Sequence, residues 1–502
     1  MASYEIMDRF EIHRNEDFLK KARELTPVLQ KKTVIPTVVK GESKGLRKGD
    51  RLFLDFGDHY VGYLRIKVSS SGSHQDAPAF IRLRLAEREA ELSADPDEYN
   101  GWISKGWIQE EWLHIDLLPD DIRLKRRYAF RYLEIEVLDT SQKFSLNVDE
   151  VTVEAASAVS VDDIELPDCG DKVLNKIMSV GAYTLQECMQ EVFEDGPKRD
   201  RRLWLGDLRL QAMADYVSFK NYEMVKRCLY LFGGLPFNDD RISACLFTEP
   251  EYASDDTYLM DYALFFVCVL YEYYEATKDM NTVYDLYDIA MHQIENTKNA
   301  LDERGIVRDL GDAFWCFVDW SEGLNKQASA QAVFIYAVRY GIRLAELMDD
   351  DIKLRELRIL EARLKAAAIE HLWDDENGLF VSGEERQISY ASQVWMILAE
   401  VLEKDKAEAL MQRTMTLDSK YKMVTPYMYH YYIEALILTG KKDIAISEIK
   451  RYWGGMINAG ADTFWELYNP DNPEESPYGS CMVNSYCHAW SCTPVYLLQK
   501  IL

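Results

Sequence analysis

The 502-residue sequence has no apolar run long enough to cross a membrane and no apolar leader. Its longest uncharged apolar stretch, 262–271 (YALFFVCVLY), has ten residues, whereas a membrane-spanning helix needs about 20. Residues 1–18 carry charges every few positions and lack the apolar core of a signal peptide. These absences predict a buried helix at 262–271 and a protein that is not exported by a signal peptide.

Closely spaced cysteine pairs are also missing. The nine cysteines are scattered between positions 169 and 492, without the spacing of a zinc site or a disulfide framework. We therefore expect reduced, mostly buried thiols in a cytoplasmic protein.

Basic residues are in deficit. The chain has 58 Lys and Arg against 85 Asp and Glu, which gives a formal net charge of -27. Such a chain is repelled by nucleic acids and by anionic membranes. Because 48% apolar and 28% charged residues are ordinary globular values, we expect a folded protein whose partners are small molecules or neutral polymers.

Several catalytic signatures are absent. The sequence contains no GxGxxG, GxxxxGK[ST], HExxH or GxSxG, which argues against dinucleotide, P-loop, zincin and α/β-hydrolase chemistry. The acidic stretch 469–477 (NPDNPEESP) lacks the ligand spacing and central glycine of a calcium loop. No metal site is predicted.

The periodicity of the sequence changes along the chain. Between about 51 and 155, short runs alternate apolar and polar residues, which predicts an antiparallel β-sandwich. From Asp168 onward, about a dozen segments have 3.6-residue spacing, which favours an α/α toroid. One of these helices is expected to end in a left-handed cap at Gly440. The boundary is expected within 160–171 (SVDDIELPDCGD), where proline and acids interrupt both patterns.

The stretch 194–207 (EDGPKRDRRLWLGD) concentrates charge around one indole. Pro197 predicts a new helical turn, with Asp195 displayed at its N-terminus and Asp200 one turn later. A solvated helix start with surface ion pairs is the ordinary alternative. The Trp204 indole beside a glycine favours a sugar pocket instead, because sugars bind aromatic platforms and carboxylates.

A second cluster, 460–469, places Glu466 directly after Trp465. If the toroid closes, Glu466 faces the first cluster across its mouth, and two facing carboxylates are what glycoside hydrolysis requires. A surface or capping carboxylate is the alternative for Glu466.

A third cluster, 311–320, contains Trp315, Asp319 and Trp320, which would either stack on a sugar or pack in the core. His488 is one of only eight histidines, and it is either a core residue or part of the site.

At this point the sequence resembles a known family. Residues 195–207 resemble the D-[CG]-x-x-R-[DE]-x-x-x-W-x-G-D motif of glycoside hydrolase family 78, the α-L-rhamnosidases. The similarity extends over roughly residues 50 to 500. LDFGDHYVGYLRIKV and RRYAFRYLEIEV resemble the family's β-sandwich, and FWCFVDWSEG, GADTFWELY and SYCHAWSCTPVYLL resemble its barrel segments.

The resemblance implies an N-terminal β-sandwich domain with a leading segment, residues 1–160, followed by an (α/α)6-barrel catalytic domain, residues 161–502. It implies release of terminal α-L-rhamnose with inversion and without a cofactor. Asp200 matches the general acid and Glu466 the general base. The remaining candidates are substrate-binding residues: Asp195, Arg199, Trp204, Asp207, Trp315, Asp319, Trp320, Trp465 and His488.

This mechanism requires Asp200 to hold its proton near neutrality, through burial and the neighbouring Asp195 and Asp207, while Glu466 stays ionised. Two departures from the family are visible. Many members have glutamate where this chain has Asp200, and many continue into a C-terminal β-domain. The barrel mouth is therefore expected to be open, or closed by a second subunit of a homo-oligomer.

Three other functions remain open. A hydrolase of the same architecture could act on another sugar, because fold does not determine substrate. A polysaccharide lyase would use a tyrosine or histidine base, although the acidic chain makes polyuronides less attractive substrates. A noncatalytic sugar-binding protein would bind rhamnose without turnover.

Overall fold

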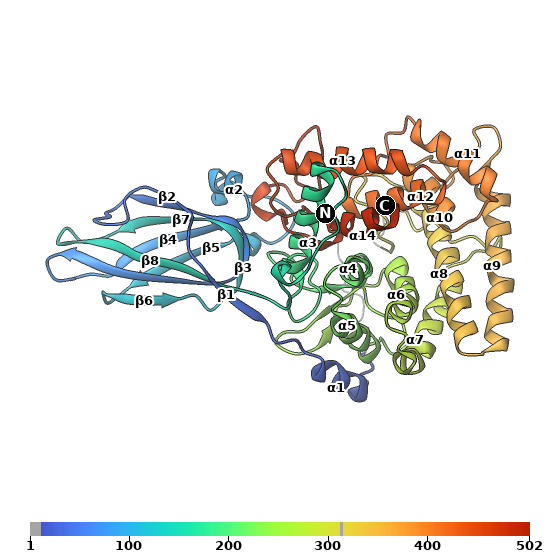
Figure 1. Cartoon of the computed structure of the whole chain (residues 1–502), viewed down its shortest axis with the longest axis horizontal. Coiled ribbons are helices and arrows are strands. Elements are labelled where there is room, and N and C mark those ends of the chain that lie inside the picture. Colours follow the sequence, from blue (N-terminus) through green and yellow to red (C-terminus); the bar gives the residue numbers. More distant parts are fainter. Residues whose placement is uncertain (1–11, 312–314) are drawn as a thin grey trace.

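The computed structural model describes residues 12–311 and 315–502, and it has a sheet region followed by a helical region (Figure 1). The first 11 residues of the predicted N-terminal domain and residues 312–314 of the third cluster lie outside the described residues. The sheet region comprises β1 Gln30–Val34, β2 Val38–Lys40, β3 Arg51–Gly72, β4 Ala79–Ala86, β5 Glu110–Ile115, β6 Asp120–Arg123, β7 Tyr128–Asp139 and β8 Phe144–Ser157.

These strands form one antiparallel sheet in the order β1-β8-β3-β7-β4-β5, and β2 and β6 also pair with β3. The predicted antiparallel pairing is confirmed. β3 shows the expected alternation, with Leu52, Leu54 and Phe56 buried on one face. An irregularity between Asp55 and Tyr60 then shifts the register, and β3 leaves β7 to pair with β8 from Gly62 onward.

Among the described residues, the helical region contains twelve α-helices, which confirms the prediction of about a dozen. They are α3 Lys172–Cys188, α4 Leu205–Val217, α5 Tyr222–Gly234, α6 Met260–Thr277, α7 Met280–Lys298, α8 Gln327–Leu347, α9 Asp351–Leu372, α10 Tyr390–Leu398, α11 Lys404–Met415, α12 Pro426–Leu438, α13 Lys442–Asn458 and α14 Pro494–Ile501.

Local chemistry explains several helix ends. The Asp171 carboxylate accepts hydrogen bonds from the backbone N–H groups of Val173 and Leu174, and this cap starts α3. Gly440 follows α12 with a φ of 75°, which confirms the predicted left-handed cap. The apolar run 262–271 lies within α6, where Tyr262 through Leu270 are all buried.

Six helices follow one another in a closed series. α4 contacts α6, α6 contacts α8, α8 contacts α10, α10 contacts α12, α12 contacts α14, and α14 returns to α4. Nearly all residues of α4 and α12 are buried, whereas α9 and α11 keep largely exposed faces. Within the described part of the chain, no helix combines the length and apolar character needed to cross a membrane.

The sheet and helical regions are joined by direct contacts. Ser157 at the end of β8 donates a hydrogen bond to the carbonyl oxygen of Gln186 in α3. The leading helix α1 (Glu16–Glu24) packs on α5 of the helical region, away from the strands (Figure 1). A segment between β4 and β5 also reaches the helical region, through the short helix α2 (Glu89–Ser93) and residues 94–109.

Candidate functional site

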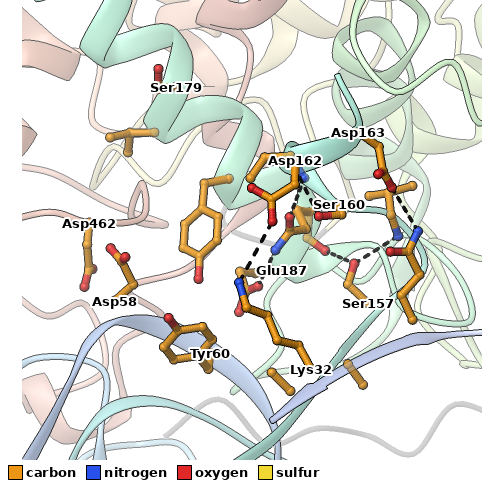
Figure 2. A pocket seen from close by; sticks show the side chains of 18 of the residues that line it. Lys32, Asp58, Tyr60, Ser157, Ser160, Asp162, Asp163, Ser179, Glu187 and Asp462 are labelled. Atoms are coloured by element: carbon orange, nitrogen blue, oxygen red, sulfur yellow. Dashed lines mark hydrogen bonds and ion pairs between the residues drawn. The ribbon is translucent and has the colours of Figure 1, made fainter. Parts of the chain in front are cut away.

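Several cavities in the described part of the chain are lined by polar side chains, and two of them lie where the sheet and helical regions meet or where predicted site residues gather. The larger, about 650 Å³, lies between the sheet and α3 (Figure 2). Its charged groups mostly pair with protein partners: Lys32 lies 3.9 Å from Asp162, Glu187 lies 3.2 Å from His59, and Asp462 lies 3.2 Å from Arg131. We interpret this cavity as part of the interface between the sheet region and the helical region.

The second cavity, about 300 Å³, combines aromatic walls with carboxylates that the sequence analysis singled out. This volume is at the small end of ligand pockets. Its walls are formed by Trp102, Ile103, Trp107, Asp195, Arg199, Asp200, Arg202, Trp204, Asp207, Asp255, Thr257, Leu259, Tyr262, Phe317, Trp320, Glu466, Tyr478, His488 and Trp490.

Residues 194–202 form a loop that is mostly buried, and the predicted helix start at Pro197 is wrong. Residues 197–200 make a turn, closed by a hydrogen bond from the Arg201 N–H to the Gly196 carbonyl oxygen at 3.0 Å, and this turn does not continue into a helix. After α3 ends at Cys188, the next helix, α4, begins only at Leu205. The loop is held by Asp195, whose carboxylate accepts the backbone N–H groups of Asp200 at 2.9 Å and Arg202 at 3.1 Å. The helix-start signal at Pro197 could not reveal these contacts across five and seven positions, nor the contact with a distant segment in which the Ala489 N–H donates to the Asp195 carbonyl oxygen. The burial of Asp195 also excludes the solvated alternative.

Asp195 therefore fixes the backbone of the proposed acid. Burial is the main cause that raises the pKa of Asp195 to about 7, and the nearby Asp200 carboxylate adds to it. The Arg199–Asp200 peptide bond is cis. The Asp200 side chain lines the cavity and is 22% exposed, so a molecule bound in the cavity can reach its carboxyl group.

Arg199 links the two predicted catalytic carboxylates. Its guanidinium forms an ion pair with Glu466, lies 3.7 Å from Asp200 and donates a hydrogen bond to the carbonyl oxygen of Val483. Burial by itself would lower the pKa of Arg199, but Glu466 and Tyr478 raise it overall, so the group stays charged. Two carboxylates 266 positions apart in the chain thus share one guanidinium.

Glu466 is oriented by further contacts. The Tyr478 hydroxyl donates to its Oε1 at 2.5 Å, and the Trp490 indole donates to its backbone carbonyl oxygen at 3.0 Å. The Arg199 guanidinium stacks over the Tyr478 ring, 4.0 Å from its centroid. One carboxylate oxygen of Glu466 is thus bound by Arg199 and the other by Tyr478.

A second pair lies in the same cavity. His488 Nε2 is 3.1 Å from Asp207 Oδ1, and both residues are buried. Burial opposes a charge on His488, yet the carboxylates of Asp207, Glu466 and Asp195 raise its pKa above the ordinary value. Burial likewise raises the pKa of Asp207. This end of the cavity offers donors and acceptors for hydroxyl groups.

Aromatic rings form the remaining wall. Phe317 stacks on Trp490 with centroids 5.5 Å apart and meets Trp320 edge-on at 5.4 Å. Trp204 meets Tyr262 edge-on at 6.2 Å. Such a wall excludes water and packs against apolar faces of a ligand.

Most of the predicted site residues meet in this cavity: Asp195, Arg199, Asp200, Trp204, Asp207, Trp320, Glu466 and His488. Three others lie elsewhere among the described residues. The Asp319 carboxylate accepts the backbone N–H groups of Val424 and Thr425 at the start of α12. Trp465 is buried, and the Arg88 guanidinium lies 4.5 Å from its ring. Trp315 is also buried, and its carbonyl oxygen accepts the Met260 N–H.

Sequence reasoning missed several lining residues. Trp102, Ile103 and Trp107 come from the sheet region, where a glycine-containing loop with two tryptophans was the available signal. Tyr478 immediately follows the acidic stretch that was examined only as a calcium loop. The other missed lining residues are Arg202, Asp255, Thr257, Leu259, Tyr262, Phe317 and Trp490. Within the described part of the chain, no group of three or more His, Cys, Asp or Glu residues could hold a metal ion.

Comparison with known proteins gives matches across nearly the whole chain. Residues 21–155 match the glycosyl hydrolase family 78 alpha-rhamnosidase N-terminal domain, and residues 165–502 match the bacterial alpha-L-rhamnosidase 6 hairpin glycosidase domain. A rhamnosidase from Klebsiella oxytoca, solved with rhamnose bound, is 43% identical with a TM-score of 0.92, covering 97% of this chain and 98% of that one.

More distant similarities support the same fold. A family 78 rhamnosidase of Bacillus sp. GL1 is 21% identical with a TM-score of 0.75, covering 89% of this chain and 46% of its own. A curated alpha-L-rhamnosidase of Formosa agariphila is 22% identical over 339 residues, which is 62% of this chain. The match covers only 33% of that relative's length.

Proposed function

Since the chain belongs to glycoside hydrolase family 78, the α-L-rhamnosidases, we propose that it hydrolyses α-L-rhamnosides, releasing terminal L-rhamnose with inversion of configuration. The observation that carries this proposal is the Arg199 guanidinium, which holds Glu466 and lies 3.7 Å from Asp200 in one aromatic cavity. The rhamnose bound to the 43% identical Klebsiella oxytoca rhamnosidase supports the choice of sugar.

In the proposed mechanism Asp200 is the general acid. Its carboxyl group gives a proton to the glycosidic oxygen as the bond between that oxygen and the anomeric carbon breaks. Glu466 is the general base: it removes a proton from water, whose oxygen forms the new bond on the opposite face of the sugar. Inversion needs roughly 6.5 to 9.5 Å between the two carboxyl groups, and a guanidinium group between them supports such a separation.

The other cavity residues bind the sugar and position the catalytic groups in this proposal. Asp207 and His488 bind hydroxyl groups, and Trp204, Trp320 and the neighbouring rings pack on the apolar face and methyl group of rhamnose. Asp195 is a positioning residue, because both its oxygens accept backbone N–H groups of the acid-bearing loop. Trp315, Asp319 and Trp465, which do not line the cavity, support its walls from behind.

The decisive experiment is release of nitrophenol from 4-nitrophenyl α-L-rhamnopyranoside by the wild-type protein, Asp200→Asn and Glu466→Gln. We expect both variants to stay folded and to lose about 10²- to 10⁴-fold in kcat, the contribution of a general acid or base. Proton NMR of the first product formed would show the β-anomer. If the wild-type protein cleaves a different aryl glycoside, the sugar assignment is wrong, and rhamnose binding without turnover would indicate a noncatalytic protein.

The finer architecture is also part of the proposal. We propose a β-sandwich domain at 1–160 and an (α/α)6-barrel domain at 161–502. The closed series of contacts α4, α6, α8, α10, α12 and α14 supports an inner ring of six helices. The division of β3 between β7 and β8 supports a sheet folded over itself.

A cytoplasmic location is proposed from the cysteines. All nine are free thiols, and Cys188 and Cys487 lie with sulfur atoms 3.8 Å apart without a disulfide, which suits a reducing compartment. Fractionation of cells that produce the protein would test this. The predicted homo-oligomer stays a prediction, which light scattering of the purified protein would test.

A further inference from the structure

A segment of the sheet region forms part of the wall of the proposed catalytic cavity. Residues 94–109, between α2 and β5, contribute Trp102, Ile103 and Trp107 to its lining. The proposed mechanism does not use them, because every catalytic and sugar-binding group comes from the helical region. The contacts of residues 94–109 indicate what this segment does.

The segment is closely fitted to the turn that carries Tyr478. A Cβ atom added to Gly101 would lie 1.9 Å from the Tyr478 carbonyl oxygen, so only glycine allows this approach of the two backbones. The Tyr99 hydroxyl lies 3.0 Å from the Ile103 carbonyl oxygen and 3.3 Å from that of Tyr478. The contact is thus built into both loops.

Trp102 is fixed in orientation and yet open to solvent. Its indole N–H donates to the Pro477 carbonyl oxygen at 2.8 Å, and its ring lies 5.5 Å from the Tyr478 ring. It nevertheless keeps 62% of its surface exposed. A large ring that is held at its polar edge and exposed on its face is suited to stacking against a ligand.

The position of Trp102 relative to the proposed catalytic groups indicates where the leaving group of the substrate would lie. Asp207, His488, Phe317 and Trp490 are buried and define the closed end of the cavity, whereas Trp102 is its exposed lining residue among those described. Tyr478 stands between the two ends, because its hydroxyl binds Glu466 and its ring faces Trp102. A sugar at the closed end therefore sends its leaving group toward Trp102.

We propose that Trp102, with Ile103 and Trp107, forms a leaving-group subsite that selects rhamnosides of planar aromatic alcohols. The inference rests on the proposed function and adds its leaving-group preference. The three side chains from this segment present apolar surface and no carboxylate or amide, so they suit an aromatic ring better than a second sugar, whose hydroxyls need partners.

The test compares two substrates that share the sugar and differ in the leaving group. 4-Nitrophenyl α-L-rhamnopyranoside carries an aromatic ring, whereas α-L-rhamnosyl fluoride releases only fluoride and cannot contact Trp102. For Trp102→Ala we expect kcat/KM to fall about tenfold on the nitrophenyl substrate, as for loss of one aromatic contact. Hydrolysis of the fluoride and inhibition by L-rhamnose should be unchanged.

Two further variants sharpen the comparison. Trp102→Phe keeps a ring without the indole N–H and should retain most of the nitrophenyl preference. Trp112→Ala removes another exposed indole of the sheet region, in β5, which is not a lining residue of the cavity, and should leave both substrates unaffected.

An equal loss on both substrates in Trp102→Ala would overturn the subsite, because it would show that Trp102 only supports Tyr478 and Glu466. Unchanged kinetics on the nitrophenyl substrate would overturn it as well. A wild-type protein that cleaves neither substrate would instead overturn the proposed function and, with it, the subsite.

Discussion

Lys198, two residues before Asp200, forms a buried ion pair with Glu91 of the sheet region, with 2.5 Å between Nζ and Oε2. Glu87 lies 3.7 Å from the same ammonium group and also accepts the backbone N–H of Tyr486, two residues before His488. His59 in β3 contacts Glu87 in turn. The sheet region thus holds both segments that carry site residues, the loop with Lys198 and Asp200 and the segment with Tyr486 and His488.

This anchor predicts a strong effect of Lys198→Met. Burial raises the pKa of Glu91 to about 7 even with Lys198 present, and removal of the cation leaves two buried carboxyl groups without it. We expect a loss of about 3–5 kcal/mol of unfolding free energy, as for breaking a buried pair, together with a fall in kcat. Urea denaturation and nitrophenyl rhamnoside kinetics would measure these.

The matched control is Lys67→Met. Lys67 pairs with Glu150 across the sheet surface, where both side chains are about 40% exposed (40% and 42%). This variant should lose no more than about 1 kcal/mol and keep full activity. Equal stability of the two variants would contradict the anchoring role of Lys198.

Arg199→Lys should be far from conservative. The guanidinium binds Glu466 and the Val483 carbonyl oxygen and stacks on Tyr478, whereas an ammonium group cannot make all three contacts. We expect kcat to fall at least about tenfold, with thermal stability measured in parallel. Arg123→Lys, at an exposed position of β6, serves as the control, and wild-type kcat in Arg199→Lys would refute the bridging role.

His488→Ala is expected to act mainly on sugar binding. Since His488 pairs with Asp207 at the closed end of the cavity, its loss removes a hydroxyl partner and leaves Asp207 without its 3.1 Å contact. KM and the inhibition constant for L-rhamnose should rise about tenfold. Trp102→Ala should leave the rhamnose inhibition constant unchanged, and the opposite pattern would exchange the roles assigned to the two ends of the cavity.

Asp215 predicts a pH dependence of stability. Burial raises the pKa of its carboxyl group in α4 to about 7, from an ordinary value of 3.8. Between about pH 4 and pH 7, Asp215 therefore keeps its proton in the folded protein and loses it in the unfolded chain. This contribution to stability is complete below about pH 4 and is lost as the pH rises through 7.

Asp215→Asn removes this titration and retains an oxygen that can accept the Asn221 N–H, as Asp215 Oδ1 does at 3.1 Å. We expect the variant to match the wild type below about pH 4, where Asp215 is protonated in both the folded and the unfolded state, and to melt at a higher temperature at pH 8. Asp121→Asn, at an exposed ion pair with Arg65 that lowers the carboxyl pKa, should show no such gain at pH 8. Parallel melting curves of wild type and Asp215→Asn would contradict the prediction.

Elements with regular local patterns could be predicted from the sequence. The helix around 262–271, the cap at Gly440 and the alternating strands were all expected, because periodicity and capping depend on near neighbours. The loop at 194–202 was not, since its conformation depends on Asp195 accepting two backbone N–H groups inside the folded protein. Asp319, predicted to bind substrate, is not among the lining residues of the cavity, and its carboxylate accepts the backbone N–H groups of Val424 and Thr425 at the start of α12.

By itself, the sequence indicated the family through the spaced motif at 195–207, and it predicted eight of the residues that line the cavity. Only the tertiary structure decided that Arg199 bridges Asp200 and Glu466, that Lys198 is held by Glu91, and that Trp102 from the sheet region lies at the cavity mouth. Arg199 and Glu466 are 267 positions apart in the chain, Lys198 and Glu91 are 107 apart, and Trp102 is 375 from Pro477, to whose carbonyl oxygen it donates. Residues that far apart meet only through packing of whole elements.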